Sequence, residues 1–461
     1  MGDRQHAIAL FNAGMEAVKN RQHATDLNQA YQNFSAAAYA DSTWWQAIYQ
    51  CGCNVSDMGQ IPAAVACWRR ALECQMEPLE RAKVLCNIGW RLHWMGYTDE
   101  ALQWTLASLD LDPKLAHAWV NLSCVQGVSG RLDDSIKSAR TAYEIDPKDP
   151  INEMAYAFAL LFGRQFKDGS RHFESRFEYK LTSYLRYPYP RWTGEAGKIV
   201  YLVSDQGLGD TLSYARFVRE AAKRAKFIHA CVQPGLIRAF QHAFIDIKNL
   251  DIAPLPARLP PADCWSTFMS LPYALGLGDA EFRHARQIEI PAYSVPSTWR
   301  VQDRKFHIGI AWRGSPLMEM NEHRSFPIHH FLELYRVPGI QLYSFQIDDA
   351  RRQLGDTGCA AVIADIGNYM HDVVDTTALL RQMDLVITCE SALGHICAAI
   401  GKECWIPYGY LAHDFRIGHV DGDRLWCPKH RIFWQKSDMK WEPVFAEIVD
   451  ALQEKVTRLK R

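Results

Sequence analysis

The sequence lacks the features that mark membrane-spanning, exported or strongly charged proteins. Its 461 residues contain no apolar run of about 18 residues, the length that a membrane span requires. The 51 Lys and Arg residues balance the 52 Asp and Glu residues, so no global charge favours nucleic acid or an anionic membrane. No apolar stretch follows the opening MGDRQHAIALF. We therefore predict a cytoplasmic protein with no membrane span and no nucleic-acid partner.

Signatures of metal sites and of nucleotide loops are scarce as well. The 13 cysteines are scattered, and no CxxC pair or Cys/His quartet with zinc spacing occurs. We expect buried, reduced thiols rather than a metal site. The chain also has no GxxxxGK[ST] sequence, which excludes a P-loop of the usual form.

What the chain does have, in its first third, is a repeat. Pro113 and Pro147 are separated by the 34-residue period of tetratricopeptide units, each of which is a pair of helices. We predict four such units and a degenerate fifth, which contains Gly169 and Phe173, across residues 1–178. Stacked helix pairs share a core and curve around a concave groove, so the array is predicted to bind a protein or peptide.

Two asparagines occupy the same position of successive repeats. Asn87 and Asn121 lie on the first helix of their units, where side chains are expected to face the groove. An amide offers both a donor and an acceptor to an extended peptide. We therefore predict an acceptor-binding ladder, the alternative being two polar residues on a solvated face.

The rest of the chain alternates between strand-like and helix-like runs. A Pro- and aromatic-rich segment, 179–197, is predicted to be a linker. One alternating series then covers residues 198–300 and a second covers 301–461. This alternation predicts two Rossmann-like domains with parallel sheets, whose ligands bind beyond the carboxyl ends of the strands.

A glycine-rich loop follows the first predicted strand. In SDQGLGDTLSYARF, Gly207 and Gly209 stand where a missing side chain lets backbone amides approach a ligand at the start of a helix. The loop is not the dinucleotide fingerprint GxGxxG, because Leu212 occupies the third glycine position.

Four motifs of this part occur in a characteristic order. They are DQGLGDTL, SLP, IGIAWRGSP with the following HRSFP, and DLVITCESALGHICAAIGKECW. Together they resemble the heptosyltransferase-like glycosyltransferases of GT-B fold that carry N-terminal tetratricopeptide repeats. The order of repeats and α/β domains is also similar to that of the O-GlcNAc transferase. The resemblance implies an α-helical tetratricopeptide superhelix followed by a GT-B pair, with the nucleotide sugar on the second domain and the acceptor approaching from the first.

The resemblance also implies a catalytic base. Asp210 matches the acid of the family's glycine loop, which is expected to take the proton of the acceptor hydroxyl. The alternative is that Asp210 is only the N-cap of the following helix.

Two arginines are the predicted cationic ligands of the donor. Arg324 matches the position where the family places a cation for the diphosphate, and Arg313 lies on the same loop. A guanidinium suits phosphate oxygens, and it stabilises a departing nucleoside diphosphate. The alternative for either arginine is a solvated side chain.

The stretch ESALGH supplies the remaining predicted donor contacts. Here Glu390 and Ser391 stand in place of the family's Asp and Thr, followed by Ala392 and His395. Ser391, Ala392 and the helix amides could hold phosphate, whereas Glu390 would accept hydroxyl hydrogen bonds. His395 could equally be a core histidine.

No metal and no cofactor are predicted, since a GT-B enzyme can stabilise its leaving group with arginine and helix amides. The segment 421–423 has the DxD pattern of metal-dependent glycosyltransferases, but Asp-Gly in this context is typical of a turn. The sequence thus predicts an inverting glycosyltransferase that acts on a protein or peptide recruited by the repeats. Two alternatives are a glycan or lipid-linked acceptor with the repeats as scaffold, and a repeat adaptor whose GT-B part is inactive.

Overall fold

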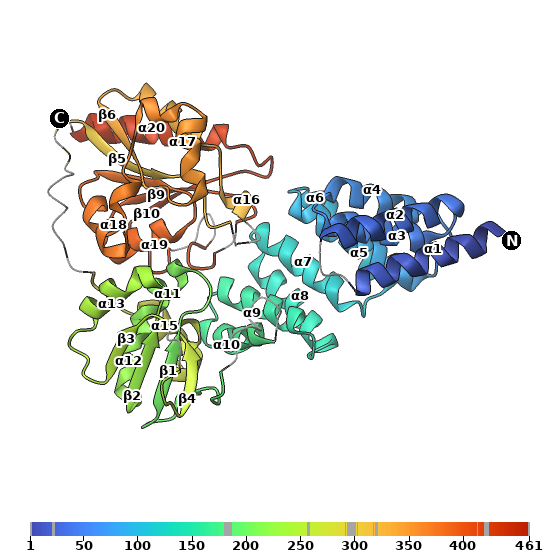
Figure 1. Ribbon diagram of the computed structural model, residues 1–461, viewed down its shortest axis with the longest axis horizontal. Helices are drawn as coiled ribbons and strands as arrows, with labels where there is room; N and C mark the ends of the chain where they lie inside the picture. The colour runs from blue at the N-terminus through green and yellow to red at the C-terminus, as the bar shows by residue number, and fades with distance from the viewer. Residues whose placement is uncertain are drawn as a thin grey trace. The chain divides into compact units, whose positions relative to one another are not determined.

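The computed structural model describes most of the chain. The described residues are 2–20, 24–178, 187–255, 259–290, 292, 301, 303–316, 318, 321–412, 414–418 and 424–459. They form two compact units, Met1–Ala159 and Leu160–Arg461 (Figure 1). Within the described residues, every helix is too short or too polar to cross a membrane.

The first unit consists of helices that pack in consecutive pairs. The second helices of two neighbouring pairs, α6 and α8, begin and end 34 residues apart, which confirms the predicted period. The paired helices are α1 (Gly2–Lys19), α2 (Ala24–Ala40), α3 (Trp45–Asp57), α4 (Ile61–Ala71), α5 (Pro78–Trp94), α6 (Thr98–Leu111), α7 (Ala116–Val128) and α8 (Leu132–Ile145). The next helix, α9 (Pro150–Phe162), contains the division between the two units.

Glycines let the two helices of a pair approach closely. A Cβ atom on Gly52 of α3 would lie 2.4 Å from the indole nitrogen of Trp68 on α4. One on Gly89 of α5 would lie 2.6 Å from the hydroxyl of Thr105 on α6. Because a Cβ atom at either position would overlap the facing helix unless that side chain moved, the small residue follows from the close packing of the pair.

The predicted fifth repeat is part of the second unit. The units divide between Ala159 and Leu160, not at residue 178. Helix α10 (Phe166–His172) packs on the later helices α14 and α15, and the ring of Phe166 stacks on Phe282 at 4.5 Å. The repeat spacing continues into α10, but this helix packs against α14 and α15 of the second unit rather than against another repeat.

The described part of the predicted linker packs on the first sheet. Residues 179–186 lie outside the described residues, whereas 187–197 pack on the first sheet. The backbone N–H of Trp192 donates to the carbonyl of Trp265 at 2.8 Å, and the Tyr187 ring contacts those of Tyr201 and Trp265. The aromatic content that suggested a linker in the sequence covers one face of the sheet.

The first-sheet domain (residues 187–290) contains a parallel four-stranded sheet of order β3-β2-β1-β4. The central strand is an unbroken apolar run, IVYLV, as expected for a strand buried on both faces. Its elements are β1 (Ile199–Val203), α11 (Leu208–Tyr214), α12 (Val218–Arg224), β2 (Phe227–Cys231), α13 (Ile237–Ala243), β3 (Leu250–Ala253), β4 (Cys264–Thr267), α14 (Leu271–Leu275) and α15 (Asp279–His284).

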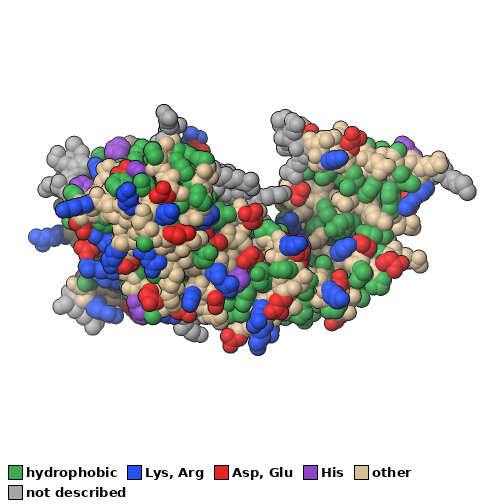
Figure 2. Space-filling view, turned by 90° about the horizontal axis from the view of Figure 1, so that it is seen from below, with side chains coloured by type: hydrophobic (Ala, Val, Ile, Leu, Met, Phe, Trp, Pro, Cys, Tyr) green, Lys and Arg blue, Asp and Glu red, His purple; other side chains and the backbone are tan. Residues whose placement is uncertain are grey.

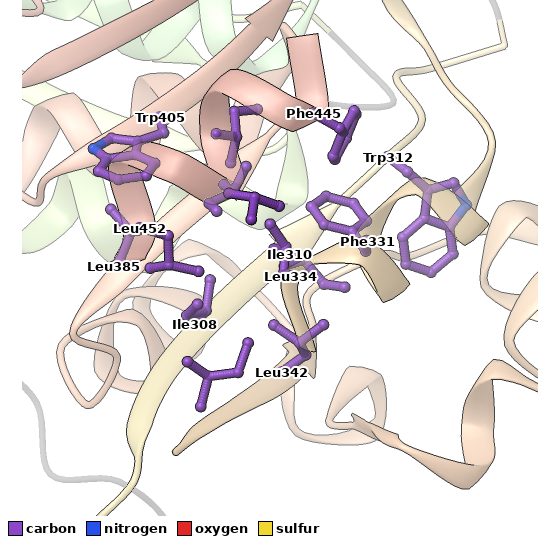
Figure 3. Close-up of a cluster of buried hydrophobic side chains, with 14 of the residues drawn as sticks. Ile308, Ile310, Trp312, Phe331, Leu334, Leu342, Leu385, Trp405, Phe445 and Leu452 are labelled. Atoms are coloured by element: carbon purple, nitrogen blue, oxygen red, sulfur yellow. The ribbon is translucent and has the colours of Figure 1, made fainter. Parts of the chain in front are cut away.

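The second-sheet domain (residues 301–459) contains a parallel six-stranded sheet of order β10-β9-β8-β5-β6-β7. Apolar residues of its central strands, such as Ile308 and Leu385, pack with Phe445 and Leu452 of the last helix in one core (Figure 3). Its elements are β5 (Phe306–Ala311), α16 (Asn321–Arg324), β6 (Ile340–Ser344), α17 (Gln353–Asp356), β7 (Ile363–Asp365), α18 (Val373–Leu380), β8 (Leu385–Thr388), α19 (Ala392–Ala399), β9 (Cys404–Tyr408), β10 (His430–Trp434) and α20 (Glu442–Leu459).

Both sheets reverse their strand order beside the first strand of the domain. The reversal falls between β1 and β4 in the first-sheet domain and between β5 and β8 in the second. The six-stranded order, numbered within its domain, is the 3-2-1-4-5-6 order of Rossmann folds. A crevice opens at such a reversal, beyond the carboxyl ends of the strands, and it is where open α/β sheets bind ligands.

Candidate functional site

The reversal point of the first sheet is filled by the chain itself. A short 3-10 helix, η1 (Phe173–Phe177), inserts Arg176, which is only 1% exposed. The guanidinium donates to the Asp205 carboxylate at 3.0 Å, the Thr267 hydroxyl at 2.9 Å and the Ser270 hydroxyl at 2.7 Å. Asp205 follows β1, whereas Thr267 and Ser270 lie at the end of β4, so these contacts span the reversal point.

Two further charged residues complete this network. Glu174 accepts from Arg176 at 2.8 Å and pairs with Arg191, whose guanidinium lies 3.7 Å from the centre of the Phe177 ring. Burial raises the pKa of Asp205, and the neighbouring guanidinium of Arg176 opposes that rise only in part. The motifs DQGLGDTL and SLP begin with Asp205 and Ser270, but no motif marks Arg176, which lies in the segment predicted to be a repeat.

At the reversal point of the second sheet, the fold brings together two residues predicted to bind the nucleotide sugar. Arg324 ends α16 on the loop after β5, and Glu390 lies two residues after the end of β8. The Arg324 Nη1 atom donates to the Glu390 carboxylate at 2.8 Å, and their side chains are 11% and 15% exposed. These residues are distant in the sequence and meet because β5 and β8 are neighbours in the sheet.

Glu390 is ionised in this setting. Burial alone would raise its pKa, but the imidazole of His395 and the guanidinium of Arg324 outweigh burial and lower it well below the usual range. Ser391 is the N-cap residue of α19, and its hydroxyl lies 3.1 Å from that of Thr388. Ala392 is the first residue of that helix.

Asp210 is at the third position of α11, and the N-cap is Gly207. The sequence alternative, in which Asp210 itself is the N-cap, is therefore wrong in position. One carboxylate oxygen accepts the backbone N–H of Gly207 at 3.1 Å, as the third residue of a helix often does. The other oxygen accepts from Arg416 at 2.9 Å.

His395 and Gly209 lie at the contact between the two sheet domains. The Nδ1 atom of buried His395 is 3.1 Å from the hydroxyl of Ser213 on α11. A Cβ on Gly209 would lie 2.5 Å from the His395 ring and 3.3 Å from the Cα of Ala392. Gly209 thus lets α11 pack directly against the start of α19, a reason for glycine that the sequence did not reveal.

Arg416 and Asp414 are functional candidates that sequence reasoning missed. Arg416 donates to both carboxylate oxygens of Asp414 at 2.7 to 2.9 Å as well as to Asp210. The imidazole of His395 lies 4.0 Å from Asp414 and 3.8 Å from Glu390. The stretch HDFRIG fits no motif by itself, and only its position in the fold places it at this site.

Three side chains of the cluster have the composition of a metal site. Ligand atoms of Glu390, His395 and Asp414 lie within 4.8 Å of one another. Each carboxylate, however, already bonds a guanidinium, Arg324 on Glu390 and Arg416 on Asp414. A cation would have to compete with both. The DxD segment 421–423 lies outside the described residues.

The other predicted ligands have different partners. Arg313 is at the second reversal point, but its guanidinium pairs with Glu322 on the surface. Asn121 is buried rather than facing a groove, because its amide donates to the Cys86 carbonyl at 2.9 Å. The half-buried Asn87 donates to the Tyr49 hydroxyl at 2.8 Å. The expected ladder of two open amides is thus not what these contacts show.

Gly209→Ala is expected to destabilise the α/β unit by about 1–3 kcal/mol, since the added methyl overpacks the contact with His395 and Ala392. Urea denaturation measures the change. Gly235→Ala is the control, because its Cβ would meet only the Leu208 side chain at an ordinary 3.4 Å. Equal stability of the two variants would contradict the prediction.

Comparisons with known proteins cover only part of this architecture. No protein-family model and no curated protein matches the chain. Among solved structures, it is similar to MamA from Desulfovibrio magneticus RS-1 (17% identity, TM-score 0.32, covering 38% of this chain and 94% of that one). It is also similar to TTC0263, a TPR protein of Thermus thermophilus (15%, 0.32, 38% and 91%), and to YrrB, a TPR protein (16%, 0.29, 38% and 86%). Likenesses this weak carry no conclusion about this chain.

Proposed function

We propose that the protein is a glycosyltransferase that moves a sugar from a nucleotide-sugar donor to a protein or peptide acceptor. The observation that carries the proposal is the ion pair of Asp210 from one Rossmann-like domain with Arg416 from the other. The charge of Asp210 also acts on Arg324, which is paired with Glu390 in the same domain as Arg416. A carboxylate opposite a cationic group at a sheet reversal point supplies a base for the acceptor hydroxyl and charge for the leaving diphosphate. The motif resemblance to GT-B enzymes supports the same reaction.

The donor is assigned to the second-sheet domain. The reversal point of the first sheet is filled by Arg176 and its partners, which leaves the second as the place for a nucleotide. There, Arg324 is positioned for phosphate oxygens and the ionised Glu390 for hydroxyl groups of the ribose or sugar. This division agrees with the donor side that the resemblance implies.

The acceptor is assigned to the repeats. A cavity of about 170 Å³ lies among the first helices of successive pairs, and its walls include Phe11, Trp45 and Tyr49. Glutamine side chains line it too, Gln46 and Gln50. Hydrophobic side chains gather on the face of the repeat unit seen in Figure 2. Such a cavity suits one apolar side chain of an extended peptide, with amides available to its backbone.

A panel of nucleotide sugars tests the donor half of the proposal. The full chain is melted with UDP-, ADP-, GDP-, CMP- and TDP-sugars, because a ligand that binds the native state raises the melting temperature. A rise with one donor class supports the proposal. No rise at millimolar concentration with any of them would overturn it.

Trp45→Ala is expected to weaken a peptide acceptor about tenfold, because an aromatic side chain lining a binding cavity often dominates affinity. Donor affinity should stay unchanged. The measurement is the acceptor KM at saturating donor, and an unchanged KM would mean that the acceptor does not bind in this cavity. If the protein transfers sugar to a glycan and the substitution leaves that rate unchanged, the scaffold alternative is favoured.

Arg324→Ala is expected to weaken nucleotide-sugar affinity by about 1.5–3 kcal/mol, the range for a hydrogen bond to a charged group. Because the change also leaves Glu390 without its guanidinium, the double variant Arg324→Met with Glu390→Gln serves as a stability control. Calorimetry on folded protein is the measurement. An unchanged nucleotide-sugar affinity in both variants would show that Arg324 does not bind the donor.

A repeat adaptor without catalysis is the second candidate. Both oxygens of Asp210 are bonded, one by Arg416 and one by Gly207, and Gly209 packs on the start of α19. These contacts give the glycine loop a purely structural use. If the protein is such an adaptor, we expect that no nucleotide sugar of the panel raises the melting temperature and that the repeats still bind peptide.

A further inference from the structure

Arg416 is a buried cation with an unused donor group. The residue is 8% exposed, and its Nε and Nη2 atoms bond the carboxylates of Asp414 and Asp210. The third nitrogen, Nη1, is buried and has no hydrogen-bond partner among the described residues. A buried donor left unpaired costs about 1–3 kcal/mol, and more on a charged group, so such an atom calls for an acceptor.

A second unpaired donor lies on the loop after β5, at the reversal point of the second sheet. Asn321 is 3% exposed, and its Oδ1 atom accepts from the Ser325 hydroxyl at 3.1 Å. Its Nδ2 atom is buried without a partner in the described part of the chain. Asn321 begins α16, the short helix that ends at Arg324, and Arg324 is joined to Glu390. Within the described residues, unpaired N–H groups thus occur on Arg416, whose partner Asp414 lies 4.0 Å from His395, and on the helix that carries Arg324.

We propose that Arg416 binds an oxyanion, which is the diphosphate of the donor if the proposed function holds, and that this binding competes with the Arg416–Asp210 contact. Oxygen atoms of a phosphate accept hydrogen bonds from guanidinium and amide groups and bring the charge that a buried cation favours. Arg416 is then a positioning residue for Asp210 as well as a ligand.

The competition follows from how the two carboxylates hold the guanidinium. Asp414 is bonded through two nitrogens at 2.7 to 2.9 Å, whereas Asp210 is bonded through one at 2.9 Å. We therefore expect the Arg416–Asp210 ion pair, rather than the Arg416–Asp414 pair, to break when an oxyanion binds Arg416. Released from the guanidinium, the Asp210 carboxylate regains lone pairs for an acceptor hydroxyl. The base is thereby freed only when the donor is present.

Inorganic pyrophosphate is the probe, and its affinity for the full chain is measured by calorimetry. Arg416→Gln should weaken it by about 10-fold to 100-fold, the loss expected for a hydrogen bond to a charged group. Asp210→Asn should tighten it several-fold, because a competing carboxylate is gone; a purely structural Arg416 would give no such gain. The control is Arg238→Gln, which removes another ion pair between the sheet domains, with Asp372 and Asp375, and should leave the affinity unchanged.

The outcomes separate this inference from the proposed function. Tighter binding in Asp210→Asn together with weaker binding in Arg416→Gln supports it. Should Arg416→Gln fail to fold, Asp210→Asn decides alone. Unchanged pyrophosphate affinity in Asp210→Asn overturns the competition, even if nucleotide sugars bind the wild-type protein. No pyrophosphate binding by the wild-type protein overturns the oxyanion site, whereas a failed nucleotide-sugar panel with intact pyrophosphate binding overturns only the glycosyl transfer.

Discussion

Asp210→Asn is expected to lower turnover by roughly 10²–10⁴, the contribution of a positioned general base. The substitution keeps the shape of the side chain and abolishes its basicity. An amide can accept from only one of the two present donors, Gly207 N–H and Arg416, so a stability loss of about 1–3 kcal/mol accompanies the change. Turnover is measured at saturating donor, together with the melting temperature.

Asp414→Asn is the matched control for this prediction. It removes a carboxylate from the same guanidinium but leaves α11 and Asp210 in place. If the lower turnover came only from the loss of a negative charge beside Arg416, Asp210→Asn and Asp414→Asn would lower turnover equally. A fully active Asp210→Asn protein would show that the acid of SDQGLGDTL is structural and that the base lies elsewhere.

Arg176→Met is expected to destabilise the α/β unit by about 3–5 kcal/mol, because it leaves two carboxylates without their buried cation. Asp205 loses its only guanidinium contact among the described residues, whereas Glu174 keeps Arg191 and the Ser270 hydroxyl. Urea denaturation of the full chain is the measurement. Arg351→Met is the control, since its ion pair with Asp365 is about one-third exposed and contributes at most about 1 kcal/mol.

The effect of Arg176→Met should depend on pH. The pKa of Asp205 is raised by burial and only partly restored by Arg176, so without Arg176 its neutral form is favoured further. A folded state that binds an extra proton loses stability as pH rises. The variant should therefore be closer to wild-type stability at pH 5 than at pH 8. An equal loss at both values would mean that Asp205 does not govern the effect.

The sequence determined the helical repeats and the parallel sheets. Both are local patterns: the period shared by Pro113 and Pro147, and apolar runs such as that from Ile199 to Val203. It also indicated residues that the fold then gathered, such as Arg324 and Glu390, because each follows a central strand of the same sheet. Loop positions after parallel strands are predictable since the strands end at one edge.

The tertiary structure decided the partners of these residues. Arg176 lies in a segment with repeat spacing, yet its guanidinium fills the first reversal point; Asn121 has repeat spacing too, yet its amide bonds Cys86. Arg416 stands in no motif, and it reaches Asp210 from a loop far along the chain. Such contacts depend on how separate segments pack, and buried charges take whichever partner that packing places within hydrogen-bond distance. Local pattern therefore fixed which elements form, and long-range packing fixed which charges meet between them.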